Sequence, residues 1–259
     1  MSRFSNLEFD SQSDGEARLQ GGERVKDEAF FLESAQAAFE QGDFERGLRA
    51  YSKVLEHNPQ NTRAWSGQVR MLIELGEYSE AKLWADKALE RFPHDPELLA
   101  AKAVALARTG DLTNALAFSD AAFEERGDTP YIWLARGDVL LARGEARSDY
   151  CFDKALSLAP GQWFVRWLVS RVHFYYKRFA SALKLAQEAL TLDAARAVLW
   201  LQLSLCQVEL GLVDSAGISI GHAMELDPRI PGAKPVVDRV AQSNPLGTLF
   251  AWIRRPFTK

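Results

Sequence analysis

The sequence predicts an all-α fold, a solenoid of six stacked helix–turn–helix units closed at its C-terminal end by a further helix. Two sets of residues that share one period support this prediction. Glycines recur at steps of 34 residues at Gly42, Gly76, Gly110 and Gly144, and Gly211 follows 67 residues later, as one step of 33 and one of 34. Small residues recur beside them: Gly47, Ala81, Ala115, Ser148, Ala182 and Ala216. Self-similarity at such a period is the signature of a repeat array.

Each of the first four units begins with a residue that can cap a helix. These residues also recur at steps of 34, as Asp27, Asn61, Asp95 and Thr129. Their side-chain oxygens can accept a hydrogen bond from a free amide of the first helical turn. The glycine about fourteen residues later provides the left-handed backbone that ends this helix. A second helix follows, and its small residues allow close packing against the first.

These signals set the boundaries of the parts. We expect six repeats within residues 23–230, at about 28–61, 62–95, 96–129, 130–162, 163–196 and 197–230. Residues 1–22 are polar and glycine-rich, so we expect a disordered N-terminal arm. Residues 231–243 place valines at helical spacing with charged residues opposite, which predicts a capping helix. We expect residues 244–259 to form an amphipathic C-terminal tail.

The second repeat carries a recognisable signature. Its positions are Trp65, Leu72, Gly76, Tyr78, Ala81, Ala88 and Pro93. In these residues the chain resembles the tetratricopeptide repeat family, and the resemblance extends over roughly 200 of the 259 residues. It implies a right-handed solenoid. The fifth repeat departs from the pattern, with Arg166 at the aromatic position, His173 at a core position and Lys177 in place of the turn glycine.

Composition and motifs argue against several functions. The formal net charge of −4 gives no general attraction to nucleic acid. Two cysteines within helical patterns suggest buried thiols, and the N-terminus has no secretory signal, so we expect a cytoplasmic location. The sequence contains no phosphate-binding, metal-binding or nucleophile motif. We therefore expect no enzyme activity, no cofactor and no metal site.

The family resemblance implies a concave groove, lined by the first helix of each repeat, that binds a peptide of a protein partner. Its predicted residues are Arg63, Arg70, Tyr131, Leu134, Asp138, Phe164, Trp167, Arg171, Phe174 and Leu201. Only Arg70 and Arg171 match the basic clamp by which some relatives bind acidic chaperone termini, so we do not predict that ligand. Arginines beside aromatic residues instead favour an apolar anchor next to an acidic residue. The predicted function is a scaffold or adaptor.

The C-terminal tail admits three interpretations. Its apolar residues recur at helical spacing, and we expect contacts through Leu249, Phe250, Trp252 and Ile253. We favour packing on the protein itself or on a partner. A short helix with two arginines binds a bilayer only marginally, so a peripheral membrane adaptor held by this tail is the alternative, and nucleic acid is the least favoured. Residues 4–9, FSNLEF, could also occupy the groove of their own protein.

Overall fold

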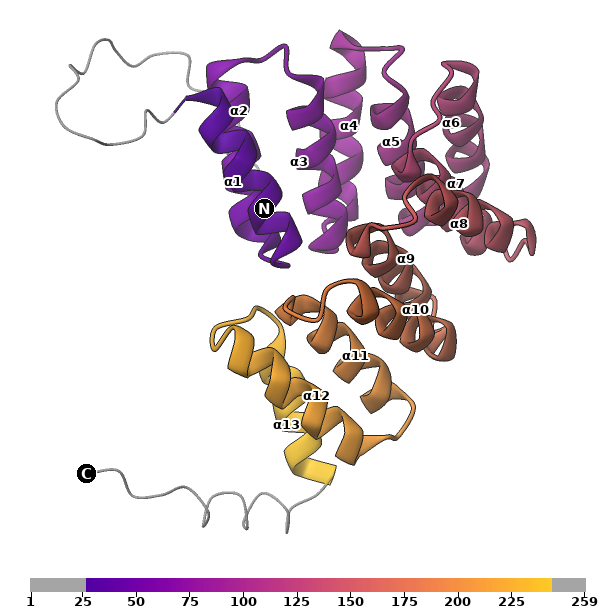
Figure 1. Ribbon diagram of the computed structural model, residues 1–259. Helices are drawn as coiled ribbons and strands as arrows, with labels where there is room; N and C mark the ends of the chain where they lie inside the picture. The colour runs from indigo at the N-terminus through magenta and orange to yellow at the C-terminus, as the bar shows by residue number, and fades with distance from the viewer. Residues whose placement is uncertain (1–26, 244–259) are drawn as a thin grey trace, which may run out of the picture. The chain divides into compact units, whose positions relative to one another are not determined.

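The computed structural model describes residues 27–243, which form thirteen α-helices and contain no strand (Figure 1). This confirms the predicted all-α helical repeat class. The N-terminal arm and the C-terminal tail lie outside the described residues. The helices fall into two compact units that meet in sequence after Leu158. We call them unit 1, with helices α1 to α8, and unit 2, with helices α9 to α13.

Unit 1 consists of four helix pairs. They are α1 (Glu28–Glu40) with α2 (Phe44–His57), α3 (Thr62–Glu74) with α4 (Tyr78–Arg91), α5 (Pro96–Thr109) with α6 (Leu112–Glu124), and α7 (Pro130–Ala142) with α8 (Arg147–Leu158). The second helix of each of the first three pairs also packs on the first helix of the next pair. Because α5 contacts both α3 and α7, the first helices form one layer and the second helices the other.

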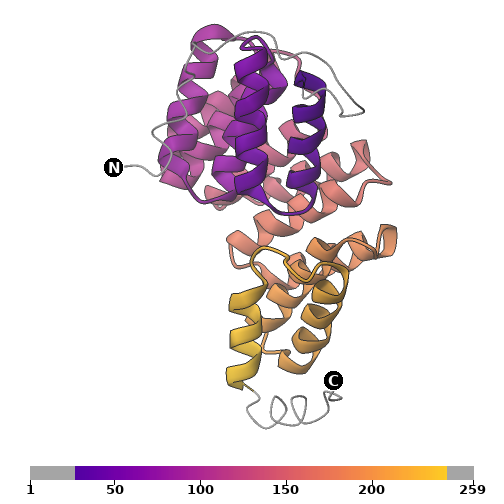
Figure 2. The same ribbon diagram turned by 90° about the vertical axis from the view of Figure 1, so that its left-hand side faces the viewer.

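Unit 2 consists of two further pairs and a last helix. The pairs are α9 (Trp163–Tyr175) with α10 (Phe179–Leu192) and α11 (Ala197–Glu209) with α12 (Val213–Leu226). The last helix, α13 (Ala233–Ser243), packs on α11 and α12 and is drawn in yellow in Figure 2. Its side chains Ala233 and Val236 are buried, while Asp238 and Arg239 are exposed. Such a helix covers the apolar end of a repeat array.

The local signals in the sequence act as predicted. The side chains of Asp27, Asn61, Asp95 and Thr129 each accept a hydrogen bond from the amide three residues later. All five turn glycines have positive φ, between 71° and 88°. The recurring small residues of the second helices are buried in every repeat. Helix ends and close helix contacts are therefore set by local sequence.

The fifth repeat keeps the same geometry with different residues. Lys177 has φ +59°, so it adopts the left-handed conformation of the turn glycines that it replaces. Arg166 Nη1 donates to the carbonyl oxygen of Pro160 at 2.7 Å. The indole nitrogens of Trp65 and Trp200 donate to the carbonyl six residues before them in the same way, at 2.9 and 2.8 Å. Arg166 thus reproduces the hydrogen bond of the tryptophan.

Candidate functional site

In unit 1, two of the predicted groove residues stack on each other. The guanidinium carbon of Arg70, on α3, lies 3.9 Å from the centre of the Tyr131 ring, on α7. It also lies 5.1 Å from the centre of the Phe39 ring on α1. Burial raises the pKa of the Tyr131 hydroxyl, and the nearby charge of Arg70 opposes that rise. Cation–π contacts of this kind hold the arginine within the protein.

A buried ion pair connects α5 and α7, which are the first helices of the third and fourth pairs of unit 1. Arg108 Nη2, on α5, lies 2.5 Å from Asp138 Oδ2, on α7. The two side chains are 6% and 2% exposed, so Asp138 has almost no surface to offer a ligand. Leu134 is also buried, whereas Arg63 is exposed. Most of the predicted groove residues of unit 1 therefore make contacts within the unit.

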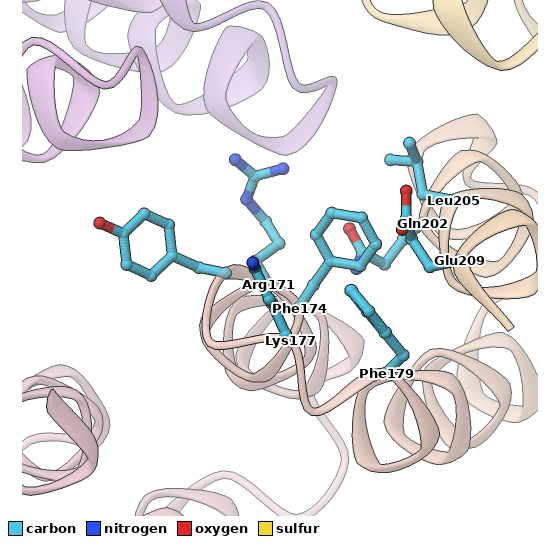
Figure 3. Close-up of a pocket in the computed structure, with 8 residues that line it drawn as sticks. Arg171, Phe174, Lys177, Phe179, Gln202, Leu205 and Glu209 are labelled. Atoms are coloured by element: carbon cyan, nitrogen blue, oxygen red, sulfur yellow. The ribbon is translucent and has the colours of Figure 1, made fainter. Parts of the chain in front are cut away.

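Unit 2 contains an open pocket of about 450 Å³, within the size range of ligand sites. Its lining comes from α9, the turn after it, the first residue of α10, and α11 (Figure 3). The lining residues are Arg171, Phe174, Tyr175, Lys177, Phe179, Gln202, Leu205 and Glu209. We call this site the unit 2 pocket.

Aromatic rings form much of the apolar lining of this pocket. The rings of Phe174 and Phe179 have centroids 5.3 Å apart and planes inclined by 59°. In Figure 3 both rings project into the space between α9 and α11, where Leu205 and Gln202 lie opposite. Gln202 is buried and donates weakly to the Cys206 sulfur at 3.6 Å, which helps to fix its amide. The arrangement suits an apolar side chain, with one amide beside it.

The charged groups of the pocket differ in their surroundings. The guanidinium carbon of Arg171 lies 5.2 Å from the centre of the Trp167 ring. Lys177 is exposed in the α9–α10 turn. Glu209 accepts a hydrogen bond from Arg239 of α13, which partly neutralises this carboxylate. Two cations thus border one side of the pocket, and a paired carboxylate borders the other.

The remaining predicted residues of unit 2 that the structure describes do not line the pocket. Trp167 is only 2% exposed, so its ring supports Arg171 and offers almost no surface to a ligand. Phe164 is half-buried against Trp163 and Trp167, with centroids 5.5 and 5.6 Å away. Leu201 is buried on α11. The tail residues Leu249, Phe250, Trp252 and Ile253 lie outside the described residues.

Sequence reasoning identified Arg171 and Phe174 but missed other members of the pocket. Phe179, Gln202 and Glu209 come from the first residue of α10 and from α11, and Lys177 from the turn between α9 and α10. The sequence contained one signal for these residues, which was Lys177 at the position where the other repeats have a turn glycine. A side chain at that position extends from a turn where the other repeats have none.

The described residues include no candidate metal cluster, and their two thiols are buried. Between residues 27 and 243 no group of three or more His, Cys, Asp and Glu side chains could hold a metal ion. Burial raises the pKa of the thiols of Cys151 and Cys206, the latter to about 12, so both are protonated and poorly nucleophilic at neutral pH. None of the helices in this range is long and apolar enough to cross a bilayer.

A family model described as a tetratricopeptide repeat matches residues 38–105, from the end of α1 to most of α5. Residues 38–105 therefore carry the tetratricopeptide repeat pattern. A comparison with curated proteins found no match. Arrays of this family generally act as non-catalytic scaffolds for protein–protein interaction, with extended concave surfaces for binding.

Two solved structures show the same fold. A tetratricopeptide repeat protein of Thermus thermophilus, TTC0263, is 21% identical with a TM-score of 0.53, over 70% of this chain and 99% of that one. Human IFIT1, solved as a dimer with m7Gppp-AAAA, is 19% identical with a TM-score of 0.51, over 82% of this chain and 55% of that one. At these identities the likeness concerns the fold alone.

Proposed function

We propose that this protein is a non-catalytic adaptor that binds a peptide segment of a protein partner in the unit 2 pocket. The observation that supports this most is the combination of a paired-ring apolar lining with two cations on one border. In unit 1, the predicted groove residues Leu134 and Asp138 are buried and offer little surface to a ligand. Unit 2 therefore provides the better ligand surface.

The lining defines the chemistry of the ligand. An aromatic or branched aliphatic side chain would pack against Phe174, Phe179 and Leu205, and burying such a side chain is worth about 1.5–3 kcal/mol. An acidic residue next to this anchor would pair with Arg171 and Lys177. We therefore infer a peptide in which apolar and acidic residues alternate.

Residues 4–10 of this chain, FSNLEFD, have this pattern and supply a defined probe. The experiment measures fluorescence anisotropy of the labelled synthetic peptide with the full chain. Two altered peptides accompany it, one with Gln and Asn in place of the acidic residues and one with Ser in place of Phe and Leu. We expect both changes to weaken binding. If the N-terminal arm occupies the pocket itself, deleting residues 1–22 will tighten binding of the probe.

Substitutions of the pocket residues test the same contacts as the altered peptides. We expect Arg171→Glu and Phe174→Ala each to weaken binding at least about tenfold, as the loss of a hot-spot contact does. Lys184→Glu is the matched control, because Lys184 is exposed on α10 outside the pocket lining. Circular dichroism verifies that each variant keeps its helices. Equal binding of FSNLEFD by Arg171→Glu and wild type, or no binding of FSNLEFD even after residues 1–22 are deleted, would contradict the proposal.

The alternative, a peripheral membrane adaptor, depends on residues 244–259, which lie outside the described residues. No feature of the described helices favours it. Flotation of the full chain with anionic vesicles, with and without these residues, separates the two functions. Co-flotation that requires the tail would support the membrane adaptor.

A further inference from the structure

The region of the last helix pair and the last helix exposes more large apolar side chains than all the other described residues together. Six of the eleven large apolar side chains that are exposed in the described residues lie between positions 210 and 237. They are Leu210, Leu212, Ile218, Met224, Leu226 and Val237. Ile218, in the middle of α12, is 65% exposed. Four of them lie on α12 and α13, which pack on each other. Exposed apolar side chains that gather on one surface mark a site that something covers.

Two glycines leave part of this surface without side chains. Gly217 and Gly221 lie one turn apart on α12, and Met224 follows on the same flank. A Cβ atom on Gly217 would lie 3.4 Å from Val240 Cγ1, so this flank faces α13. A Cβ atom on Gly221 would meet nothing within 4 Å. We name the surface formed by Gly217, Ile218, Gly221 and Met224 on α12, with Val237 on α13, the α12–α13 shelf.

The α12 side of the shelf carries negatively charged side chains. Helix α12 contains Asp214 and Glu225, both exposed, and no lysine or arginine. Its only basic group is His222, whose Nδ1 lies 3.4 Å from Glu225 Oε2. On α13, Asp238 is exposed, Arg239 already donates to Glu209, and Lys234 is the other base. The shelf thus suits an apolar segment that carries positive charge.

We propose that residues 244–259 of the same chain fold back and cover the α12–α13 shelf. This segment starts where α13 ends and contains Arg254, Arg255 and Lys259 but no acidic side chain. Its apolar residues are those predicted to make contacts, Leu249, Phe250, Trp252 and Ile253. They pack on the shelf, and the arginines lie near Asp214 and Glu225. The charge and the apolar content of the two surfaces match.

The length of the segment permits this return. Residues 244–253 span about 15 Å as a helix or about 33 Å when extended, and α13 is about 16 Å long. Asn244, Pro245 and Gly247 are residues that reverse a chain readily. The turn and the covering segment therefore fit within the sixteen residues that follow Ser243.

Amide hydrogen exchange of the full chain, read by mass spectrometry, tests this inference. We expect residues 246–253 to exchange at least about tenfold more slowly than an unstructured peptide. Gly221→Gln places a polar side chain on the shelf, in open space, and should abolish this protection without unfolding α12. Gly161→Gln is the matched control, because a Cβ atom there also meets nothing within 4 Å, in a turn away from the shelf. Its tail should stay protected.

Three results would overturn the inference. Exchange of residues 246–253 at the unstructured rate in the wild type would show that nothing covers the shelf from this chain. Equal protection in Gly221→Gln and wild type would place the tail elsewhere. Protection that increases with protein concentration would show that the shelf is covered by a second copy of the chain.

Discussion

At the start of α9, Arg166 donates to the Pro160 carbonyl in the way that Trp65 and Trp200 donate in their own repeats. We expect Arg166→Ala to lower the free energy of unfolding by about 1 kcal/mol, the usual contribution of one hydrogen bond. Arg166→Trp should recover most of this loss, because the indole nitrogen can reach the same carbonyl. Urea denaturation compares the two variants. Equal destabilisation by alanine and tryptophan would mean that the hydrogen bond is not what the position requires.

Lys177 provides a second test at the scale of one residue. Its φ of +59° is an unfavourable backbone conformation for a residue with a Cβ atom, whereas glycine adopts it without this cost. We expect Lys177→Gly to raise the free energy of unfolding by about 0.5–1 kcal/mol, after the greater freedom of glycine in the unfolded chain is counted. The same change in the interior of α10, Lys184→Gly, should lower it by about 1 kcal/mol. A loss of stability in Lys177→Gly would contradict the assigned backbone conformation.

At the level of the helices, some glycines lie at close helix contacts and others face open surface. A Cβ atom on Gly137 of α7 would lie 2.4 Å from the buried ring of Phe152 on α8, whereas one on Gly221 would meet nothing. Gly137→Ala should therefore cost about 1–3 kcal/mol by overpacking. Gly221→Ala should instead gain about 1 kcal/mol of helix propensity. Thermal denaturation of both variants measures this difference, and effects of the same sign would be inconsistent with the packing of α7 on α8.

The elements also show why the fold was easier to predict than the site. Caps such as Asp95 and turn glycines such as Gly110 act within a few residues, so their spacing in the sequence defines the helices. The unit 2 pocket instead combines Phe174, Phe179 and Leu205 from three helices. Which of their side chains meet depends on how these helices pack. Trp167 illustrates the difficulty, since helical spacing placed it in the groove while packing buries it.

At the scale of the whole molecule, each unit contains one buried thiol. Cys151 belongs to α8 in unit 1 and Cys206 to α11 in unit 2. Because burial raises the pKa of both thiols, they should react with a thiol reagent mainly after their unit opens. Labelling in increasing urea, read residue by residue, follows each unit separately. We expect Gly137→Ala to lower the midpoint for Cys151 more than that for Cys206, and equal shifts would mean that the chain unfolds as one cooperative body.

In our proposal, the unit 2 pocket binds a peptide of alternating apolar and acidic residues. Nuclear magnetic resonance mapping of the isotope-labelled full chain, titrated with the peptide FSNLEFD, tests it most directly. We expect the largest chemical-shift changes at Phe174, Lys177 and Leu205, and we expect Arg171→Glu to remove them. Changes concentrated on α3, α5 and α7 of unit 1 would contradict it.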